Sequence, residues 1–256
     1  ILQGTLPGIR QMRSPCLLLW LEAPLQSWGF DSKFGRRDTL AFPTKSGVLG
    51  MVCSALGAGG EQRVLLAEFA PLGQTVVSFT RGKQTADGII KQDREPLLRD
   101  FHMVGAGYDL KDPWQALLEP YKNDDKPRKS DGGGNKMTYR YYLQDAAFAV
   151  VLEVPVDKAE AIALALQNPA WDIYLGRKNC VPTDFIYRGT FDNGAIALEQ
   201  AHSIARQKNR IEDFRVLHGA LGEGEADEVF TLNDVPLQFG EDKRYGDRQV
   251  SLINAG

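Results

Sequence analysis

The sequence predicts an α+β protein built in the order β-α-β, a long excursion, and β-α-β again. Three observations support this fold class. A continuous apolar run at 16–21 is typical of a buried strand, and helix signals follow at 46–56 and return at 158–167. Between the two halves, residues 82–142 show no clear period and are polar. A stretch of this length is uncommon in a compact domain unless it is functional or partly disordered.

The first half is predicted to supply two strands and two helical segments. The apolar run, CLLLWL, lies between prolines and has the length of a strand. A Thr or Ser before residue 47 can cap the first helix, and the glycine cluster at 57–60 can end it. A further helical segment is expected at 61–69, and a second strand, QTVVSFTR, at 74–81.

The second half repeats this pattern after the excursion. Residues 147–154, AFAVVLEV, are predicted to form the third strand, and Asp157 is predicted to cap the helix at 158–167. Residues 171–175 are predicted as the fourth strand, and a later helix is expected near 195–205. This order is that of a ferredoxin-like fold, which RNA-recognition domains share.

The chain divides into a leader, a main domain and a C-terminal subdomain. Residues 1–11 precede Met12 and are interpreted as a leader, an alternative start or a cloning remnant. Residues 12–181 form the main domain, which includes a thumb-like hairpin excursion at about 82–142. Residues 182–256 are predicted to form a small C-terminal β-rich subdomain.

The composition is that of a globular protein and gives no direct sign of nucleic-acid binding. Of the 256 residues, 43% are hydrophobic and 25% are charged, and the net charge is −3. A basic domain is the usual signal of a nucleic-acid binder. The charge is uneven, however, because basic residues cluster at 33–45 and 122–140. Phosphate binding requires only a local basic groove, so the composition is compatible with RNA as a ligand.

No metal, cofactor or membrane segment is predicted. Cys16, Cys53 and Cys180 are too scattered for a disulfide framework and lack the paired spacing of a zinc site, which suits a reducing cytoplasm. His202 and His218 show no metal-ligand spacing. No apolar stretch approaches the roughly 20 residues that cross a bilayer.

Five short motifs occur in order along the first 180 residues. They are PLQSWG (24–29), FPTKSGVLG (42–50), LRDFH (98–102), YLQDAAF (142–148) and YLGRKNC (174–180). Each is weak alone, but their order and spacing resemble the CasD family of type I-E Cascade, within the repeat-associated (RAMP) superfamily. The resemblance extends from Met12 to about Pro182 and is thin beyond it.

This resemblance implies a non-catalytic subunit of a CRISPR surveillance complex in antiviral defence. In that family the subunit binds the 5′ handle of the crRNA, meets the large subunit and caps the backbone filament, and its thumb reaches over the RNA. We therefore expect crRNA, the large subunit and a backbone subunit as partners, and target DNA indirectly through the complex. The basic insertion at 121–137 is longer than the family usually carries, and its role is left open.

Two basic motifs flanked by glycine are candidate phosphate sites. Thr44, Lys45 and Ser46 stand at the start of a predicted helix, where backbone N–H groups and the dipole favour an anion. The alternative is that Thr44 or Ser46 only caps the helix, and we expect both roles together. Arg177 and Lys178 follow a predicted strand, where they either contact phosphate or form a solvated turn.

Base contacts are predicted from amide and aromatic side chains. Gln26 offers an amide to a base edge, and Trp28 offers a flat ring for stacking, although a core position for Trp28 is equally supported. Tyr139, Tyr141 and Tyr142 beside Arg140 suit stacking or cross-strand packing. The predicted RNA-binding residues are Gln26, Trp28, Arg36, Arg37, Thr44, Lys45, Ser46, Arg99, His102, Arg140, Arg177 and Lys178.

Two other functions are considered. Some type I-C relatives cleave their own precursor crRNA, and here His102, assisted by Lys136 and Tyr139, is the candidate acid or base of a metal-independent endoribonuclease. The type I-E family leaves cleavage to a separate subunit, so we expect no catalytic residue and interpret His102 as a thumb residue. The third alternative is an interaction module without RNA, which the cations in three separate glycine-flanked loops argue against.

Overall fold

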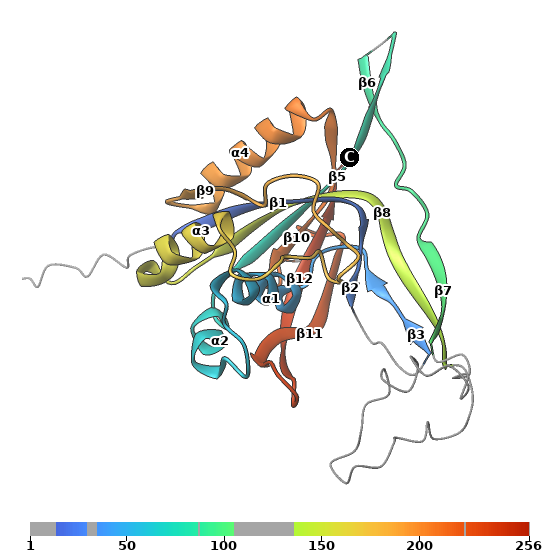
Figure 1. Ribbon diagram of the computed structural model, residues 1–256. Coiled ribbons are helices and arrows are strands. Elements are labelled where there is room, and N and C mark those ends of the chain that lie inside the picture. The colour runs from blue at the N-terminus through green and yellow to red at the C-terminus, as the bar shows by residue number, and fades with distance from the viewer. Residues whose placement is uncertain (1–13, 30–34, 87, 105–135, 223, 256) are drawn as a thin grey trace, which may run out of the picture.

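The computed structural model describes residues 14–29, 35–86, 88–104, 136–222 and 224–255 (Figure 1). This part of the chain is mixed α+β. Ten of its strands form one mostly antiparallel sheet, whose main path runs β11–β12–β10–β5–β8–β1–β9, and β2 pairs with β4 apart from it. The strands are β1 (Cys16–Gln26), β2 (Trp28–Gly29), β3 (Arg36–Arg37), β4 (Thr39–Leu40), β5 (Gln74–Thr85), β6 (Gly88–Lys91), β7 (Leu98–Val104), β8 (Lys136–Glu153), β9 (Tyr187–Phe191), β10 (Arg210–His218), β11 (Glu228–Gln238) and β12 (Arg244–Asn254).

Helices cover both faces of the sheet, which explains the continuous apolar run in β1 (Figure 1). Leu17, Leu19 and Leu21 point to one face and pack with α1 (Lys45–Leu56), α2 (Arg63–Phe69) and α3 (Ala159–Gln167). Leu18 and Trp20 point to the other face and pack with α4 (Gly194–Gln207). Since successive side chains of a strand alternate between faces, a strand buried on both sides must be apolar throughout.

Strand β8 is long because it belongs to two parts of the sheet. Its second half pairs with β1 and β5, from Leu143 to Glu153 on the β1 side. Its first half extends beyond the core and pairs with β7 and, in parallel, with β3. Strand β5 also extends outward and forms a hairpin with β6 (Figure 1). The predicted excursion at 82–142 therefore supplies β6, β7 and the outer half of β8.

The structure confirms several predicted elements and corrects two. The predicted helices at 46–56, 61–69, 158–167 and 195–205 correspond to α1, α2, α3 and α4. The predicted strand at 171–175 is wrong, because this segment is a loop and β9 takes the place beside β1. Asp157 does not cap α3, since the 3₁₀ turn η2 (Val156–Lys158) precedes that helix and Lys158 holds the cap position.

Strands from residues 182–256, where a subdomain was predicted, continue the central sheet. Strand β10 pairs with β5, β12 with β10, and β11 with β12. Their apolar side chains, including Phe214, Val216 and Val250, join the core cluster of α1 and β1. The predicted leader at 1–11 and the basic insertion at 121–137, apart from its last two residues, lie outside the described residues.

Candidate nucleic-acid interface

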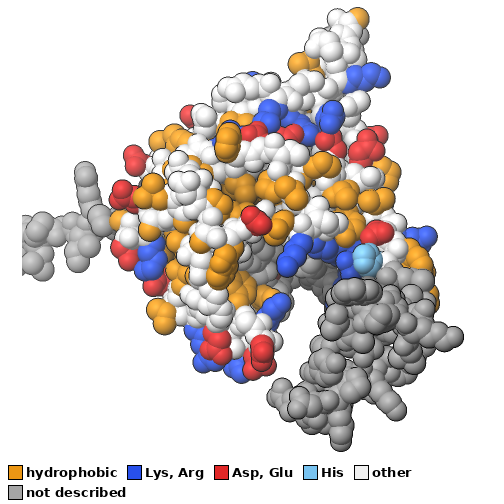
Figure 2. All heavy atoms as spheres, viewed as in Figure 1, with side chains coloured by type: hydrophobic (Ala, Val, Ile, Leu, Met, Phe, Trp, Pro, Cys, Tyr) orange, Lys and Arg blue, Asp and Glu red, His pale blue; other side chains and the backbone are white. Residues whose placement is uncertain are grey.

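Three strands that lie beyond the core bring several of the predicted residues together. We call β3, β7 and residues 136–142 of β8 the outer strip. In its register Arg36 pairs with Tyr139, and Arg37 pairs with Arg140. On the other side of β8, Arg99 pairs with Tyr141 and His102 with Thr138. In Figure 2, Lys and Arg side chains gather where these strands meet. Five predicted residues, separated by up to about 100 positions in the sequence, therefore meet on the outer strip.

One face of the outer strip combines arginines with exposed aromatic rings. The guanidinium of Arg36 lies 5.0 Å from the ring centroid of Tyr141, and that of Arg99 lies 5.5 Å from the Tyr139 ring. The rings of Phe101 and Tyr139 are 5.4 Å apart and are 50% and 43% exposed. We call these five residues the aromatic face. Exposed rings beside guanidinium groups are what single-stranded nucleic acids use for stacking and phosphate contact.

The opposite face of the strip carries Arg37, Arg140 and His102, because side chains alternate along each strand. The His102 Nδ1 atom lies 3.7 Å from an oxygen of Asp100, and both side chains are exposed. The Lys136 side chain, proposed as a helper of His102, lies outside the described residues. Among the described residues, no group of three or more His, Cys, Asp or Glu side chains is arranged to hold a metal ion.

Arg177 and Lys178 lie in the loop between α3 and β9, next to the outer strip. The Arg177 guanidinium donates to the Arg37 carbonyl at 2.9 Å and, at 3.4 Å, to the Tyr141 carbonyl. It also lies 4.7 Å from the ring centroid of Tyr142, which is buried. Lys178 is exposed. The two neighbouring cations therefore differ, since one is held against the protein and the other faces solvent.

Gln26 and Trp28 lie in the core and are not placed to read bases. The Gln26 side chain is fully buried, and its Nε2 donates to the carbonyls of Leu21 and Ala146. The Trp28 indole is 1% exposed, and its Nε1 donates to Gln26 Oε1 at 3.2 Å. Of the two positions predicted for Trp28, the structure thus confirms the one in the core. The Gln26 amide therefore holds the end of β1 against β8 and is not available to a base edge.

The start of α1 is filled by the protein itself. Thr44 Oγ1 accepts a hydrogen bond from the Gly47 N–H at 3.1 Å, which confirms Thr44 as the cap. The Lys45 N–H donates to Asp234 Oδ2 at 2.7 Å, so a carboxylate already occupies the place where a phosphate was predicted. Ser46 is half-buried and donates to Thr44 Oγ1.

The Lys45 side chain points inward and is fully buried. Its Nζ donates to the carbonyls of Ala70 at 3.0 Å and Leu72 at 2.7 Å. Burial, reinforced by the charge of Arg248, lowers the pKa of Lys45 to about 8, against the opposing effect of Asp234. A phosphate contact by Lys45 is therefore not supported by its position, because its ammonium is buried and two of its three N–H groups donate to the backbone.

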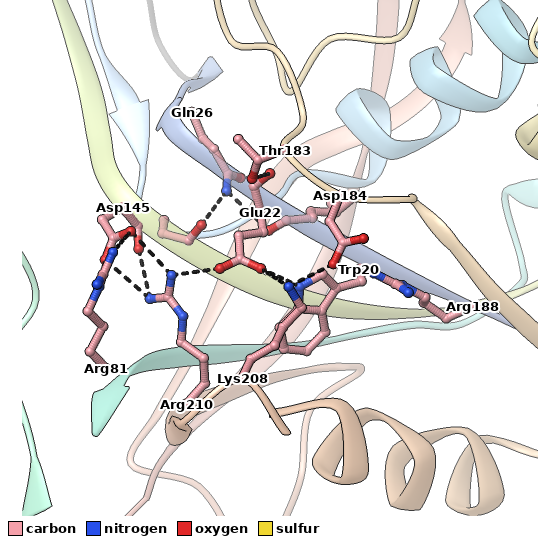
Figure 3. A network of polar contacts seen from close by, with 12 residues as sticks. Trp20, Glu22, Gln26, Arg81, Asp145, Thr183, Asp184, Arg188, Lys208 and Arg210 are labelled. Carbon is pink, nitrogen blue, oxygen red and sulfur yellow. Dashed lines mark hydrogen bonds and ion pairs between the residues drawn. The ribbon is translucent and has the colours of Figure 1, made fainter. Parts of the chain in front are cut away.

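A network of ion pairs that sequence reasoning missed lies where β8 leaves β5 (Figure 3). Asp145 has a left-handed backbone, φ 48°, and accepts from Arg81 and from Arg210. The nearly buried Arg210 also pairs with Glu22 at 2.8 Å. Arg81 and Arg210 hold the pKa of Asp145 below its usual range. No local pattern signals this network, since its members come from β1, β5, β8 and β10.

The three cysteines are buried and free. Burial raises the pKa of both Cys16 and Cys53 to about 11, which leaves them as thiols near neutral pH. Within the residues that the structure describes, no helix is long and apolar enough to cross a membrane.

Comparisons with known proteins show the family to which this chain belongs. A family model described as CRISPR-associated protein (Cas_Cas5) matches residues 16–251. The chain belongs to this family of CRISPR-associated proteins, as its five motifs predicted.

The individual relatives agree with this assignment. The CRISPR system Cascade subunit CasD of Escherichia coli (strain K12) is 32% identical over 181 residues, which cover 68% of this chain and 70% of that protein. A chain of a solved CRISPR RNA-guided surveillance complex matches with a TM-score of 0.63 and 28% identity, over 94% of this chain and 90% of that one. A crystal structure of a Cas protein matches with a TM-score of 0.56 and 27% identity, over 94% of this chain and 98% of that one.

Proposed function

We propose that this protein is a non-catalytic subunit of a Cascade-type CRISPR surveillance complex in the cytoplasm, where it binds the 5′ handle of the crRNA. The observation that carries the proposal is the aromatic face of the outer strip. Two arginines and two exposed rings lie side by side there, on strands that extend away from the core. Handle phosphates would pair with the arginines, and unpaired bases would stack on Phe101 and Tyr139.

The fold supports the same proposal. Strands β5, β8, β1 and β9 are adjacent in the sheet, and α1 and α3 lie on the connections between them. This order fits a ferredoxin-like unit of the RAMP type. We assign the β5–β6 hairpin and the outer strip to the thumb. The large subunit, a backbone subunit and, indirectly, target DNA are the partners we propose with the crRNA, because the CasD relative is a Cascade subunit.

The test is RNA binding by the full chain, alone and assembled with its partner subunits, in EDTA. Labelled repeat RNA that contains the handle is titrated at several salt concentrations. Each arginine that contacts a phosphate of single-stranded RNA contributes about 0.7 to the slope of log affinity against log salt. Arg36→Ala and Arg99→Ala should each lower that slope, whereas Phe101→Ala should weaken binding about tenfold with an unchanged slope, because base stacking carries no charge.

A matched control is Arg63→Ala on α2. Arg36 is exposed and pairs with Asp38 at 2.8 Å, and Arg63 is likewise exposed and pairs with Glu61. Helix α2 lies far from the outer strip (Figure 1). Replacement of Arg63 removes the same charge and should leave handle binding unchanged. Equal losses from Arg63→Ala and Arg36→Ala would show that overall charge, and no particular surface, attracts the RNA, and would contradict the proposal.

The same experiment tests the alternative function of a metal-independent endoribonuclease. The exposure of His102 on the outer strip is the observation that keeps this function under test. Cleavage of the repeat RNA at one position, lost in His102→Ala, would establish a processing nuclease in place of a scaffold subunit. Intact RNA after prolonged incubation with the assembled protein supports the non-catalytic role.

A further inference from the structure

Arg177 was predicted to bind RNA, but its contacts indicate a different role. Its side chain is half-buried, and the guanidinium is directed at the protein. One nitrogen donates to the Arg37 carbonyl at 2.9 Å, and the other lies 3.4 Å from the Tyr141 carbonyl. The group also stacks on the buried Tyr142 ring at 4.7 Å. Arg177 thus touches β3 and β8 at once and holds the two strands together.

The loop that carries Arg177 is fixed at its base. Leu175 O accepts from the Ser27 N–H at 3.1 Å, and Leu175 N–H donates to the Cys180 carbonyl at 2.8 Å. Gly176 adopts φ 97°, and a Cβ atom at this position would lie 1.7 Å from the Ser27 carbonyl oxygen. The backbone of Arg177 therefore starts from a rigid support, as a side chain that positions another element requires.

Strand β3 needs such support because it is very short. It comprises Arg36 and Arg37 alone, and among the described residues it pairs with β8 and with no other strand. The neighbouring Gly35 carbonyl accepts from the Tyr139 N–H at 2.7 Å. So few hydrogen bonds do not hold a strand rigidly. The Arg177 hydrogen bond to the Arg37 carbonyl adds one charge-assisted contact on the backbone of β3 itself.

We propose that Arg177 is a positioning residue: it fixes β3, and thereby Arg36 and Arg37, against β8 in the orientation that RNA binding needs. This inference rests on the proposed function of the outer strip. It assigns Arg177 to the protein side of the interface, although its type and its glycine neighbour are typical of a phosphate contact.

Arg177→Lys separates positioning from phosphate contact. Lysine keeps the positive charge and would preserve a phosphate contact, but it cannot donate to two carbonyls while it stacks flat on Tyr142. We expect handle affinity to fall about tenfold, which corresponds to the loss of one charge-assisted hydrogen bond. The salt slope should fall as well, because the phosphate contacts that weaken are those of Arg36 and Arg37, whereas a lysine that kept a phosphate contact of its own would leave both the affinity and the slope at their wild-type values.

A double-mutant cycle makes the test stricter. If Arg177 acts through β3, then Arg177→Lys should change affinity by less than about twofold in a chain that already carries Arg36→Ala and Arg37→Ala. Additive losses would instead show that Arg177 contacts RNA independently and would overturn the proposal, while handle binding itself would stand.

A measurement without RNA keeps the two proposals distinguishable. In hydrogen exchange on the free chain, Arg177→Lys should speed exchange in peptides that cover β3 and residues 136–142, and leave peptides from β1 unchanged. Unchanged exchange in the outer strip would overturn the positioning role, whatever the RNA data show. If Arg177→Lys speeds exchange but the assembled wild-type protein does not bind handle RNA, then Arg177 does hold β3. In that case the proposed function is refuted, and with it the role of Arg177 in RNA binding.

Discussion

Replacement of Gly176 by alanine should destabilise the protein strongly, and the structure gives the reasons. With φ 97°, this residue has a backbone that L side chains rarely adopt, and the added Cβ would lie 1.7 Å from Ser27 O and 2.7 Å from Ser27 C. Neither atom belongs to a side chain that can rotate away. The loop must therefore move from β1, and the hydrogen bond between the Ser27 N–H and Leu175 O is lost.

The expected magnitude is the sum of three effects. The left-handed backbone costs a non-glycine residue about 1–2 kcal/mol. The shift forced by overpacking costs typically about 1–3 kcal/mol. The lost backbone hydrogen bond adds about 1 kcal/mol. We expect Gly176→Ala to lower the free energy of unfolding by about 3–6 kcal/mol, a large part of the roughly 5–15 kcal/mol that a native protein has.

Urea unfolding, followed by far-UV circular dichroism, measures this loss, and Gly60→Ala is the matched control. Gly60 also has a positive φ, 80°, but a Cβ atom added there would meet no atom within 4 Å beyond its own chain neighbours. Its replacement should cost the backbone effect alone, about 1–2 kcal/mol. Equal losses for the two variants would refute the argument from the close approach of Ser27.

Two further predictions concern charged groups. Because the pKa of Lys45 is lowered to about 8 from 10.5, the unfolded state holds more protons between these values, so the stability of the wild type relative to Lys45→Met should rise with pH from 8 to 10.5. The rise is at most about 3 kcal/mol, and urea unfolding at each pH measures it. The raised thiol pKa values lower the stability of both proteins alike above about pH 9. A stability difference between wild type and Lys45→Met that does not change with pH would show that Lys45 titrates normally. Asp145→Asn should destabilise the protein by about 1 kcal/mol, since a third of the side chain is exposed, and Asp145→Ala by about 1 kcal/mol more, because asparagine tolerates a left-handed backbone. Equal thermal unfolding of these two variants would contradict the role given to φ.

The core could be predicted from the sequence because a strand that is buried on both faces is a continuous apolar run. The apolar run in β1 and the capped, glycine-ended α1 follow from local residues alone. The loop at 171–175 shows the limit of this reasoning. Ile173 and Leu175 are buried and alternate as in a strand, yet burial needs no strand partner, and β9, with the half-exposed sequence YRGTF, takes the edge of β1.

The candidate site was predictable in part. Arg36, Arg37, Arg99, Arg140 and His102 do meet on the outer strip. The direction in which a side chain points depends, however, on partners that are distant in the sequence, and no local pattern predicts it. Lys45 was expected to face a phosphate, but its Nζ finds the Ala70 and Leu72 carbonyls, and its N–H finds Asp234. Phe101 was overlooked because a single aromatic in a strand is ordinarily core.

The contact between Asp234 and the start of α1 has a consequence for synthesis on the ribosome. Asp234 follows Lys45 by 189 residues. At about 5–20 residues per second, this carboxylate emerges roughly 10–40 s after the helix that it completes. We therefore expect the nascent chain to hold α1 in an unfinished state until β11 arrives, and a ribosome-bound chain stalled before residue 228 should be cut readily by protease near residue 45, unlike the released protein.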